Sequence, residues 1–465
     1  MKVKLMQKLF KLMSESGQYL NKSLMFGGSF LFLAFSQVAQ GQKSQQAGAT
    51  DIRRITLGEA QSMATSVSPL VRQAQADLES QTERRRGAWS NVGPKLKGEY
   101  SDVRFEDKQT AQFGPQEIVI RDDKSQTGSL TLVQPITGFW ALTDRARFEG
   151  VQEEMKGNTL NLTKSDTLFF VTETYLRASL MNEMYRIAQA SITSVDSQLR
   201  DAKALERVGR INRGDVLRLE LAVSESKARA AEAKAARDIT LANLRESLGL
   251  SPGTDFEIDT VGETSFADIP QTVETAYQMA LERRLETKQS KLGVKSAEFG
   301  KNLAYTGFTP SISAFVKWDH NFGEPTGLAG TDKDTRTYGI KLEWDLWNNG
   351  AGVFAVREAV AQMQKAEAAS LGLDQQIRLD VYQAFANLQA ARESLALAEV
   401  AVSQAEEAYR IEKARFSTGS RSATDLVLAE TAQVGARGRL VSGRTNVLVW
   451  RLKLQRAVGS DQPKL

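Results

Sequence analysis

The chain has 465 residues, with 60 Lys and Arg, 56 Asp and Glu, one His and no Cys. Without cysteine it can form no disulfide, no thiolate metal site and no lipidated N-terminal Cys, and one histidine leaves almost no material for a catalytic triad or a zinc site. We therefore expect no enzyme activity, no catalytic residue, no metal site and no cofactor.

Residues 1–41 are typical of a secretory signal peptide. Lysines up to Lys22 precede an apolar run at 24–35, and small residues follow at Ala39 and Gly41. The run is shorter than the roughly 20 residues that a helix needs to cross a bilayer. The long basic lead leaves open a different start codon or an anchored segment.

Removal of this signal changes the charge argument. It carries five Lys and one Glu, which accounts for the whole formal charge of +4. The mature chain is therefore neutral, and its charge gives no reason to expect nucleic acid as a partner. An exported chain without reactive side chains favours transport or a structural role.

One unit occurs twice in the mature chain. Three residue pairs are separated by 210 positions, and Pro94 and Pro310 by 216; the three pairs are Gly209 and Gly419, Asp215 and Asp425, and Gly249 and Gly459. We place the six extra residues in the loop at 107–128. The expected division is a signal peptide at 1–41, an N-terminal extension at 42–54, a first repeat at 55–250, a linker at 251–270, a second repeat at 271–460 and a tail at 461–465.

Each repeat is expected to contain a helix, two strands, a long helix, a turn and a helix. Prolines mark the joints and are absent from 136–251 and 326–462, which leaves room for long helices.

The strands of the first repeat are the less regular ones. Leu96 and Tyr100 alternate with polar residues, but the phase then slips towards Val103 and Phe105, which predicts a β-bulge. The second strand of this repeat is expected at 129–135.

In the second repeat, hydrophobic and polar residues alternate over 311–322 and 336–347. A membrane-spanning hairpin and a soluble sheet with one wet face both predict such alternation. Two isolated soluble hairpins would be only marginally stable, which favours the membrane. One chain supplies four strands, too few to close a barrel in lipid, whereas three chains supply twelve.

The long helix of the second repeat is expected from about 353 to 415. Its apolar residues alternate spacings of four and three, a 3.5-residue period that predicts supercoiled packing. The seam comprises Ile377, Val381, Ala384, Leu388, Ala391, Leu395, Ala398, Val402 and Ala405. A second strip with Phe385, Ala386 and Leu397 suggests packing on more than one side. By periodicity alone, an ordinary solvent-exposed coiled coil is the favoured interpretation of this helix.

These features together resemble the TolC family of outer-membrane efflux ducts. The resemblance covers roughly 55–460 and includes "SLTLVQPITGFW", "GIKLEWDLWNNG", both glycine-broken turns and the closing "LRESLGL" and "LQRAVG". It implies an α+β membrane protein with two helix–β-hairpin–helix repeats per chain. Three chains would form a 12-stranded outer-membrane β-barrel continued by a long periplasmic α-helical barrel.

The resemblance also implies partners and a function. Such homotrimers contact outer-membrane lipid and join a periplasmic adaptor (membrane fusion) protein to an inner-membrane pump or ABC transporter. They are passive exit ducts for drugs or secreted proteins, in efflux pumps or type I secretion. The competing interpretation is a non-transport surface or periplasmic coiled-coil protein. An adaptor is disfavoured because it would carry one helical hairpin, not two.

The two turns then become tips of the periplasmic tube. Gly209 and Gly419 permit the chain reversal, and Asp215 and Asp425 stand where a helix dipole favours negative charge. Both aspartates are also explained as simple helix-start residues. The resemblance implies that the tips dock the adaptor, through Val208, Gly209, Arg210, Thr418, Gly419, Ser420 and Ser422.

The resemblance further implies a polar gate at Asp215, Phe416, Arg421 and Asp425. Phe416 stands where the best-known members carry Tyr, and Leu428 replaces a second acidic position. The gate is therefore expected to be looser, or to be held by Arg421 and the extra basic residues Arg210 and Arg213. We expect Asp215 and Arg421 to be linked, and adaptor docking to break that link.

Overall fold

The computed structural model describes residues 53–136, 139–259, 270, 272–323, 333–460 and 463. The expected signal peptide at 1–41 lies outside these residues, as do most of the expected N-terminal extension and tail. The chain divides into two compact units, 1–53 and 54–465, and the helices and strands described below belong to the second unit, apart from the first residue of β1.

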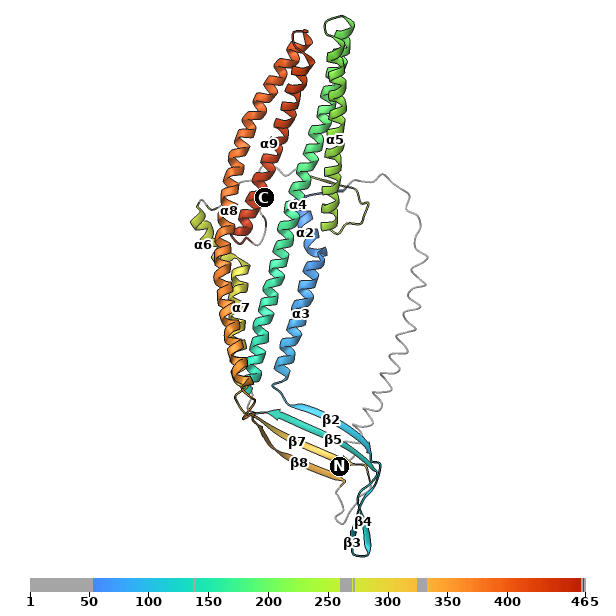
Figure 1. The fold of residues 1–465 in the computed structure, drawn as a ribbon, viewed down its shortest axis with the longest axis vertical. Helices are drawn as coiled ribbons and strands as arrows, with labels where there is room; N and C mark the ends of the chain where they lie inside the picture. Colours follow the sequence, from blue (N-terminus) through green and yellow to red (C-terminus); the bar gives the residue numbers. More distant parts are fainter. Residues whose placement is uncertain are drawn as a thin grey trace, which may run out of the picture. The chain divides into compact units, whose positions relative to one another are not determined.

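Apart from the β3–β4 hairpin, which occurs only in the first half, the two halves of the chain contain the same elements in the same order (Figure 1). The first half comprises β1 (Arg53–Ile55), α2 (Leu57–Val67), α3 (Pro69–Ser90), β2 (Lys95–Arg104), β3 (Gln109–Phe113), β4 (Gln116–Arg121), β5 (Lys124–Pro135), α4 (Phe139–Arg207) and α5 (Arg213–Ser247). The second comprises β6 (Phe256–Ile258), α6 (Val273–Arg283), α7 (Leu285–Thr306), β7 (Ser311–Asn321), β8 (Asp334–Glu343), α8 (Ala351–Ser417) and α9 (Ala423–Ala457). The helix–hairpin–helix order expected from the sequence is therefore present twice.

The repeat extends to the short helices, where the sequence analysis did not find it. Thr56 caps α2 by accepting a hydrogen bond from the backbone nitrogen of Glu59, and Thr272 caps α6 by accepting one from Thr275. Two alanines follow each cap at the same spacing and are fully buried, namely Ala60, Ala64, Ala276 and Ala280. All three pairs differ by the 216 positions that separate Pro94 and Pro310.

Two of the paired glycines are required by close packing. Gly249 and Gly459 both have positive φ, at 65° and 82°. A Cβ on Gly249 would lie 2.2 Å from Cγ1 of Val67, and one on Gly459 would lie 2.7 Å from the backbone nitrogen of Arg284. Val67 and Arg284 stand at the α2–α3 and α6–α7 breaks, so each repeat closes its last helix against the break in its first.

The predicted linker at 251–270 contains an ordered strand, because β6 pairs with β1 in a two-stranded sheet. Tyr175 of α4 holds this sheet. Its hydroxyl donates to the carbonyl oxygen of Ile55 at 2.9 Å and accepts from the backbone nitrogen of Asp259 at 3.0 Å. The two halves of the chain therefore meet on α4 at this point.

Four strands form one antiparallel sheet in the order β2-β5-β7-β8. The β2–β5 register runs without interruption from Lys95 opposite Val133 to Arg104 opposite Lys124. The bulge expected near Val103 is therefore wrong: the partner strand keeps β2 in phase through a stretch where hydrophobicity does not alternate.

The strand ends also differ from the sequence prediction. β5 begins at Lys124, five residues before the expected 129–135. β8 runs from Asp334 to Glu343, so Trp344 to Trp347, which the strand expected at 336–347 included, lie beyond its end. The 107–128 loop contains the β3–β4 hairpin, with a register shift between Gln109 and Thr110.

The sheet has one apolar and one polar face, as the alternation predicted. Paired residues share a face, so the register joins Leu130 with Trp318 and Thr131 with Lys317. The apolar face carries Leu96, Tyr100, Leu130, Leu132, Val316, Trp318, Tyr338, Ile340 and Leu342, and the polar face Lys97, Glu99, Ser129, Thr131, Lys317, Asp319, Lys341 and Glu343.

The long helices form two antiparallel hairpins, α4–α5 and α8–α9, whose turns lie at the end opposite the sheet (Figure 1). The 67 residues of α8 extend about 100 Å at 1.5 Å per residue. Among the described helices, none is both long enough and apolar enough to cross a bilayer.

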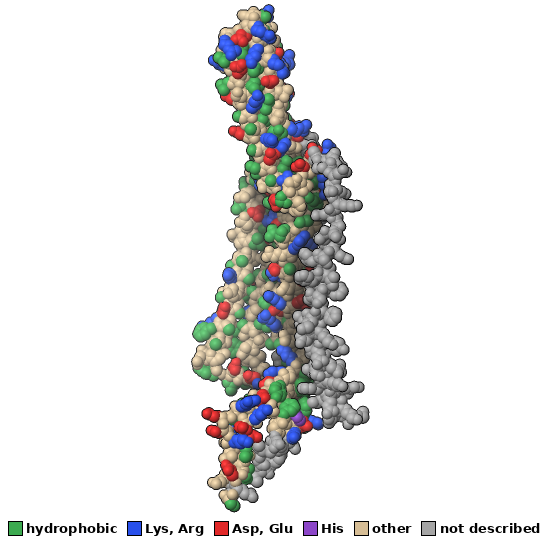
Figure 2. All heavy atoms as spheres, turned by 90° about the vertical axis from the view of Figure 1, so that its right-hand side faces the viewer, with side chains coloured by type: hydrophobic (Ala, Val, Ile, Leu, Met, Phe, Trp, Pro, Cys, Tyr) green, Lys and Arg blue, Asp and Glu red, His purple; other side chains and the backbone are tan. Residues whose placement is uncertain are grey.

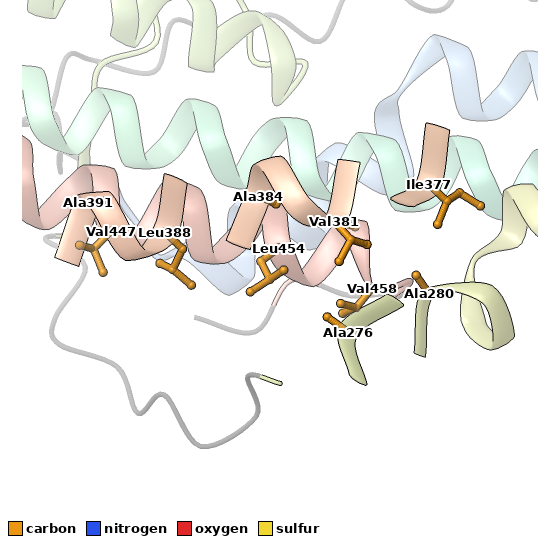
Figure 3. Packing of buried hydrophobic residues seen from close by; sticks show 11 residues of the cluster. Ala276, Ala280, Ile377, Val381, Ala384, Leu388, Ala391, Val447, Leu454 and Val458 are labelled. Carbon is orange, nitrogen blue, oxygen red and sulfur yellow. The ribbon is translucent and has the colours of Figure 1, made fainter. Parts of the chain in front are cut away.

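The seam predicted on α8 is confirmed. Ile377, Val381 and Leu388 are buried and pack with residues of α9 and α6 (Figure 3). Those partners are Val447, Leu454, Val458, Ala276 and Ala280. In the second strip, Phe385 packs against this cluster, whereas Leu397 is 72% exposed in the single chain, so packing at Leu397 stays a prediction.

Candidate functional site

The two turns at the ends of the helical hairpins are built alike. Gly209 and Gly419 have φ of 74° and 75°, a conformation that favours glycine because it lacks a Cβ. Residue 210 donates from its backbone nitrogen to the carbonyl oxygen of Leu205 at 2.9 Å, and Ser420 to that of Arg415 at 3.0 Å. Both glycines therefore terminate a helix of more than 60 residues in the same way.

Both returning helices also begin alike. The Asn212 side chain accepts a hydrogen bond from the backbone nitrogen of Asp215 at 3.0 Å, and Ser422 accepts one from Asp425 at 3.3 Å. Asp215 and Asp425 thus lie in the first turns of α5 and α9, where the helix dipole favours their charge. The sequence analysis missed Asn212, although it stands 210 positions before Ser422 and both residues are preferred helix caps.

Asp215 also joins the two turns. Its Oδ1 accepts a hydrogen bond from the backbone nitrogen of Ala423, the first residue of α9, at 3.0 Å. Nη1 of Arg218 donates to the hydroxyl of Thr424 beside it. The carboxylate of one hairpin therefore caps the returning helix of the other, a role that no local sequence pattern indicates.

An apolar cluster lies beneath this contact. Phe416 is 2% exposed and packs among residues of both hairpins. The buried members are Ala202, Val216, Leu219, Phe416, Ala423 and Leu426. Phe416 therefore needs no hydroxyl in this chain. Its phenyl ring packs in the apolar cluster, and the Asp215 carboxylate accepts its hydrogen bond from the backbone nitrogen of Ala423 instead.

Arg421 lies elsewhere. Its guanidinium is 3.7 Å from a carboxylate oxygen of Glu412 and 3.8 Å from one of Asp425, both in its own hairpin. Within the described residues of one chain, Asp215 bonds Ala423 and the ion pairs of Arg421 stay in its own hairpin, so the expected Asp215–Arg421 link stays a prediction. Ion pairs as exposed as those of Arg421 contribute about 0–1 kcal/mol each.

Charge of both signs covers the tips (Figure 2). Arg213 lies within 3.7 Å of Glu206 and 3.9 Å of Glu220, and Lys203 lies 3.0 Å from Glu220. The hydrogen bond from Lys203, with the charge of Lys203 and Arg213, lowers the pKa of Glu220. Basic residues here are therefore paired with acids across the α4–α5 turn.

The residues expected to dock an adaptor lie at the surface. Val208 is 69% exposed, and the other members of this set are also exposed, namely Gly209, Arg210, Thr418, Gly419, Ser420 and Ser422. A Cβ on Gly419 would lie 3.4 Å from the carbonyl oxygen of Arg210, so the two turns are near neighbours. Among the described residues, no His, Cys, Asp and Glu side chains cluster as a metal site requires.

A sequence model of the outer membrane efflux protein family matches residues 276–460, which include β7, β8, α8, the second turn and α9. The second half of the chain therefore matches this family. Together with the relatives and solved structures described next, the match indicates an outer-membrane protein whose function is transport and not catalysis.

Two curated relatives align with most of the chain at low sequence identity. The chain is 23% identical over 357 residues to the proteases secretion protein PrtF of Dickeya chrysanthemi, and the alignment covers 73% of this chain and 74% of PrtF. It is 22% identical over 300 residues to the outer membrane efflux protein BepC of Brucella suis biovar 1 (strain 1330), covering 64% of each.

Solved structures share the fold. The outer membrane protein VceC of Vibrio cholerae superposes with a TM-score of 0.74 at 17% identity, over 87% of this chain and 96% of VceC. CusC, whose structures are described in terms of folding and transmembrane channel formation, superposes with a TM-score of 0.77 at 16% identity. The superposition covers 90% of this chain and 95% of CusC. The fold of residues outside the family match is therefore that of outer-membrane channels as well.

Proposed function

We propose that three copies of this protein form the passive outer-membrane exit duct of a tripartite efflux pump or a type I secretion system. The single observation that carries the proposal is the four-stranded sheet, whose outer strands β2 and β8 each lack a partner on one side within the sheet. Unpaired strand edges are not tolerated in lipid, so the sheet must close. Three copies supply twelve strands, enough for a barrel.

The faces of the sheet support this closure. Tyr338, Ile340 and Leu96 lie on the apolar face, and Tyr338 is 81% exposed in the single chain. Such a face is suited to lipid. The opposite face carries three ion pairs of 2.8 Å, Lys97–Glu99, Lys317–Asp319 and Lys341–Glu343, and is suited to a water-filled lumen.

The helical part also presents surface that a second copy would cover. Along α8, several large apolar side chains are exposed in the single chain, namely Leu371, Leu379, Tyr382, Leu397 and Val400. Contiguous exposed apolar surface marks an interaction site. In the trimer, helices of the neighbouring copy would cover this stripe, and six hairpins would enclose a periplasmic tube.

The turns supply the gate of the proposed duct. Separating the hairpins at the tips breaks the Asp215–Ala423 bond and exposes the Phe416 cluster to water. A hydrogen bond to a charged group contributes about 1.5–3 kcal/mol, and threefold symmetry repeats it. An adaptor that docks on Val208, Thr418 and their neighbours would supply the energy to separate the turns. Arg421 and Asp425 belong to the same gate region, at the second turn.

The cargo follows from the partners of the duct. PrtF is named for protease secretion and BepC for efflux, so both protein and small-molecule export fit this fold. A wide passive tube discriminates little, and the inner-membrane pump or ABC transporter would select what enters.

The proposal is tested on the signal-stripped protein in detergent. We expect a trimer by light scattering with detergent correction, and discrete conductance steps after insertion into planar bilayers. A water-soluble monomer that inserts into no bilayer would instead support the coiled-coil structural protein.

A further inference from the structure

Behind the apolar cluster at the tips, the four long helices meet through a layer of polar side chains. Ser191, Ser194 and Gln198 come from α4, Ser226 and Arg229 from α5, Tyr409 from α8, and Glu430 from α9. Four of the seven are almost fully buried, namely Ser191, Gln198, Ser226 and Glu430. A polar layer inside a coiled-coil contact lowers its stability relative to an apolar one.

Glu430 is the most unusual member of this polar layer. Its carboxyl is 2% exposed, and its Oε1 accepts a hydrogen bond from the Ser191 hydroxyl at 2.6 Å. The bond crosses from α9 to α4, so it links the two hairpins. Burial raises the pKa of Glu430, while the bond from Ser191 and the charge of Arg229 oppose that rise.

The charged groups around Glu430 are engaged with other partners. Arg229 of α5 donates to Ser226 at 3.1 Å and lies 3.9 Å from Glu225. Two turns further along α9, Arg437 pairs with Glu406 of α8 at 2.7 Å.

The remaining titratable group of the layer, Tyr409 of α8, is also engaged. Its hydroxyl is 3.0 Å from the hydroxyl of Ser194 and accepts from the side chain of Gln198 at 2.9 Å. The recorded partner of the Glu430 carboxyl is thus a neutral hydroxyl, which suits the protonated acid as well as the carboxylate.

We propose that Glu430 is a second control point of the duct, set back from the tips, whose ionisation favours separation of the two hairpins. This inference rests on the proposed gating function. In the packed state the acid is buried and its neutral form is favoured, whereas in the separated state water hydrates the carboxylate. Protonation therefore favours closure, and deprotonation favours opening.

The direction and size of the effect follow from linkage. Between the ordinary carboxyl pKa, about 4.3, and the raised value of the packed state, each rise of one pH unit shifts the equilibrium towards separation up to tenfold per subunit. Below this window Glu430 is protonated in both states, and above it ionised in both, so the response is flat on either side.

The experiment uses distance measurements on the full-length mature protein in detergent. Because the chain has no cysteine, Val208→Cys and Ser420→Cys place one spin label on each tip. Labelled chains are diluted with unlabelled ones so that the distance within one chain dominates. In the Glu430-containing protein we expect the longer-distance population to grow as pH rises. In Glu430→Gln this population stays small at every pH, and Glu406→Gln, an exposed acid, behaves as the parent.

A pH response in Glu430→Gln equal to that of the parent would overturn the inference. If Glu430→Gln fails to assemble, Ser191→Ala takes its place: loss of the hydroxyl raises the pKa of Glu430 in the packed state, so the response should level off at a higher pH. If the pH at which the response levels off is the same in Ser191→Ala as in the parent, the inference is also overturned. The spin-label distances are measured without any ion current. A protein whose tips separate as pH rises but which conducts no ions would therefore contradict the proposed duct function and not the role of Glu430.

Discussion

The Asp215 carboxylate caps a helix that belongs to the other hairpin, accepting the backbone hydrogen of Ala423 at 3.0 Å. The same residue lies in the first turn of its own helix, α5. One side chain therefore stabilises its own helix start through charge and the start of α9 through a direct bond. Within one chain, Asp215 therefore joins the tips together with Arg218, which bonds Thr424.

Replacement of Asp215 by Ala should loosen the tips. The free amide of Ala423 loses its acceptor, and we expect the packed state to be destabilised by about 1–3 kcal/mol per chain. Planar-bilayer recordings should show a higher open fraction. Asp201→Ala, at an exposed position of α4, serves as the control and should conduct like the parent. Equal open fractions in both variants would argue against the role of Asp215.

Replacement of Phe416 by Ala should unpack the cluster beneath the tips. Removal of a buried phenyl ring costs about 3–5 kcal/mol. Hydrogen exchange of backbone amides in 199–205 and 416–426 should accelerate at least a hundredfold. Leu428→Ala removes an exposed side chain and should change the same amides little. Protection that survives in Phe416→Ala would mean that the cluster contributes little to closing the tips.

A comparison of Gly249 with Gly253 separates the cost of close packing from the cost of backbone strain. Gly249→Ala meets Val67 at 2.2 Å and has positive φ, whereas Gly253→Ala has positive φ, 87°, in open space. We expect about 1–2 kcal/mol of destabilisation for Gly253→Ala and about 1–3 kcal/mol more for Gly249→Ala. Thermal unfolding followed by circular dichroism measures the difference, which Val67→Ala should reduce. Identical midpoints for both single variants would contradict the packing argument.

Tyr175 should make stability depend on alkaline pH. Burial raises the pKa of this hydroxyl to about 12. Above pH 10 the unfolded chain releases the proton while the folded chain retains it, so stability falls between pH 10 and 12 by about 1.4 kcal/mol per pH unit. Urea unfolding across this range checks the slope. In Tyr175→Phe that component should vanish, and the β1–β6 contact should weaken because Ile55 and Asp259 lose their partner.

Local patterns in the sequence were enough for the regular elements. The 3.5-residue period from Ile377 to Ala398 predicted a buried seam, and the alternation at 311–322, broken at Phe315 and His320, predicted a two-faced strand. Gly209 and Gly419 indicated the turns because only a residue without a Cβ reverses the chain there without strain. Each of these signals depends on neighbours within a few residues.

The candidate site was predicted less completely because its contacts are distant in sequence. Asp215 was predicted to be a gate residue, but its bond to Ala423 spans 208 residues and has no local sequence signal. From the sequence, Phe416 was interpreted as a gate residue without its hydroxyl. Only its tertiary contacts show that the side chain belongs to a buried apolar cluster. Likewise, β2 pairs without interruption because β5 keeps it in register. The hydrophobic pattern near Val103 gave no sign of this pairing.

By itself, the sequence determined the duplicated order of elements, the two faces of the strands and the positions of the turns, since these follow from short-range periodicity and backbone freedom. The tertiary structure decided which hairpin Asp215 caps, that Phe416 is buried, and that Glu430 lies against Ser191 out of reach of water. Those outcomes depend on how two hairpins, each regular in itself, are brought into register, and packing between distant segments sets that register.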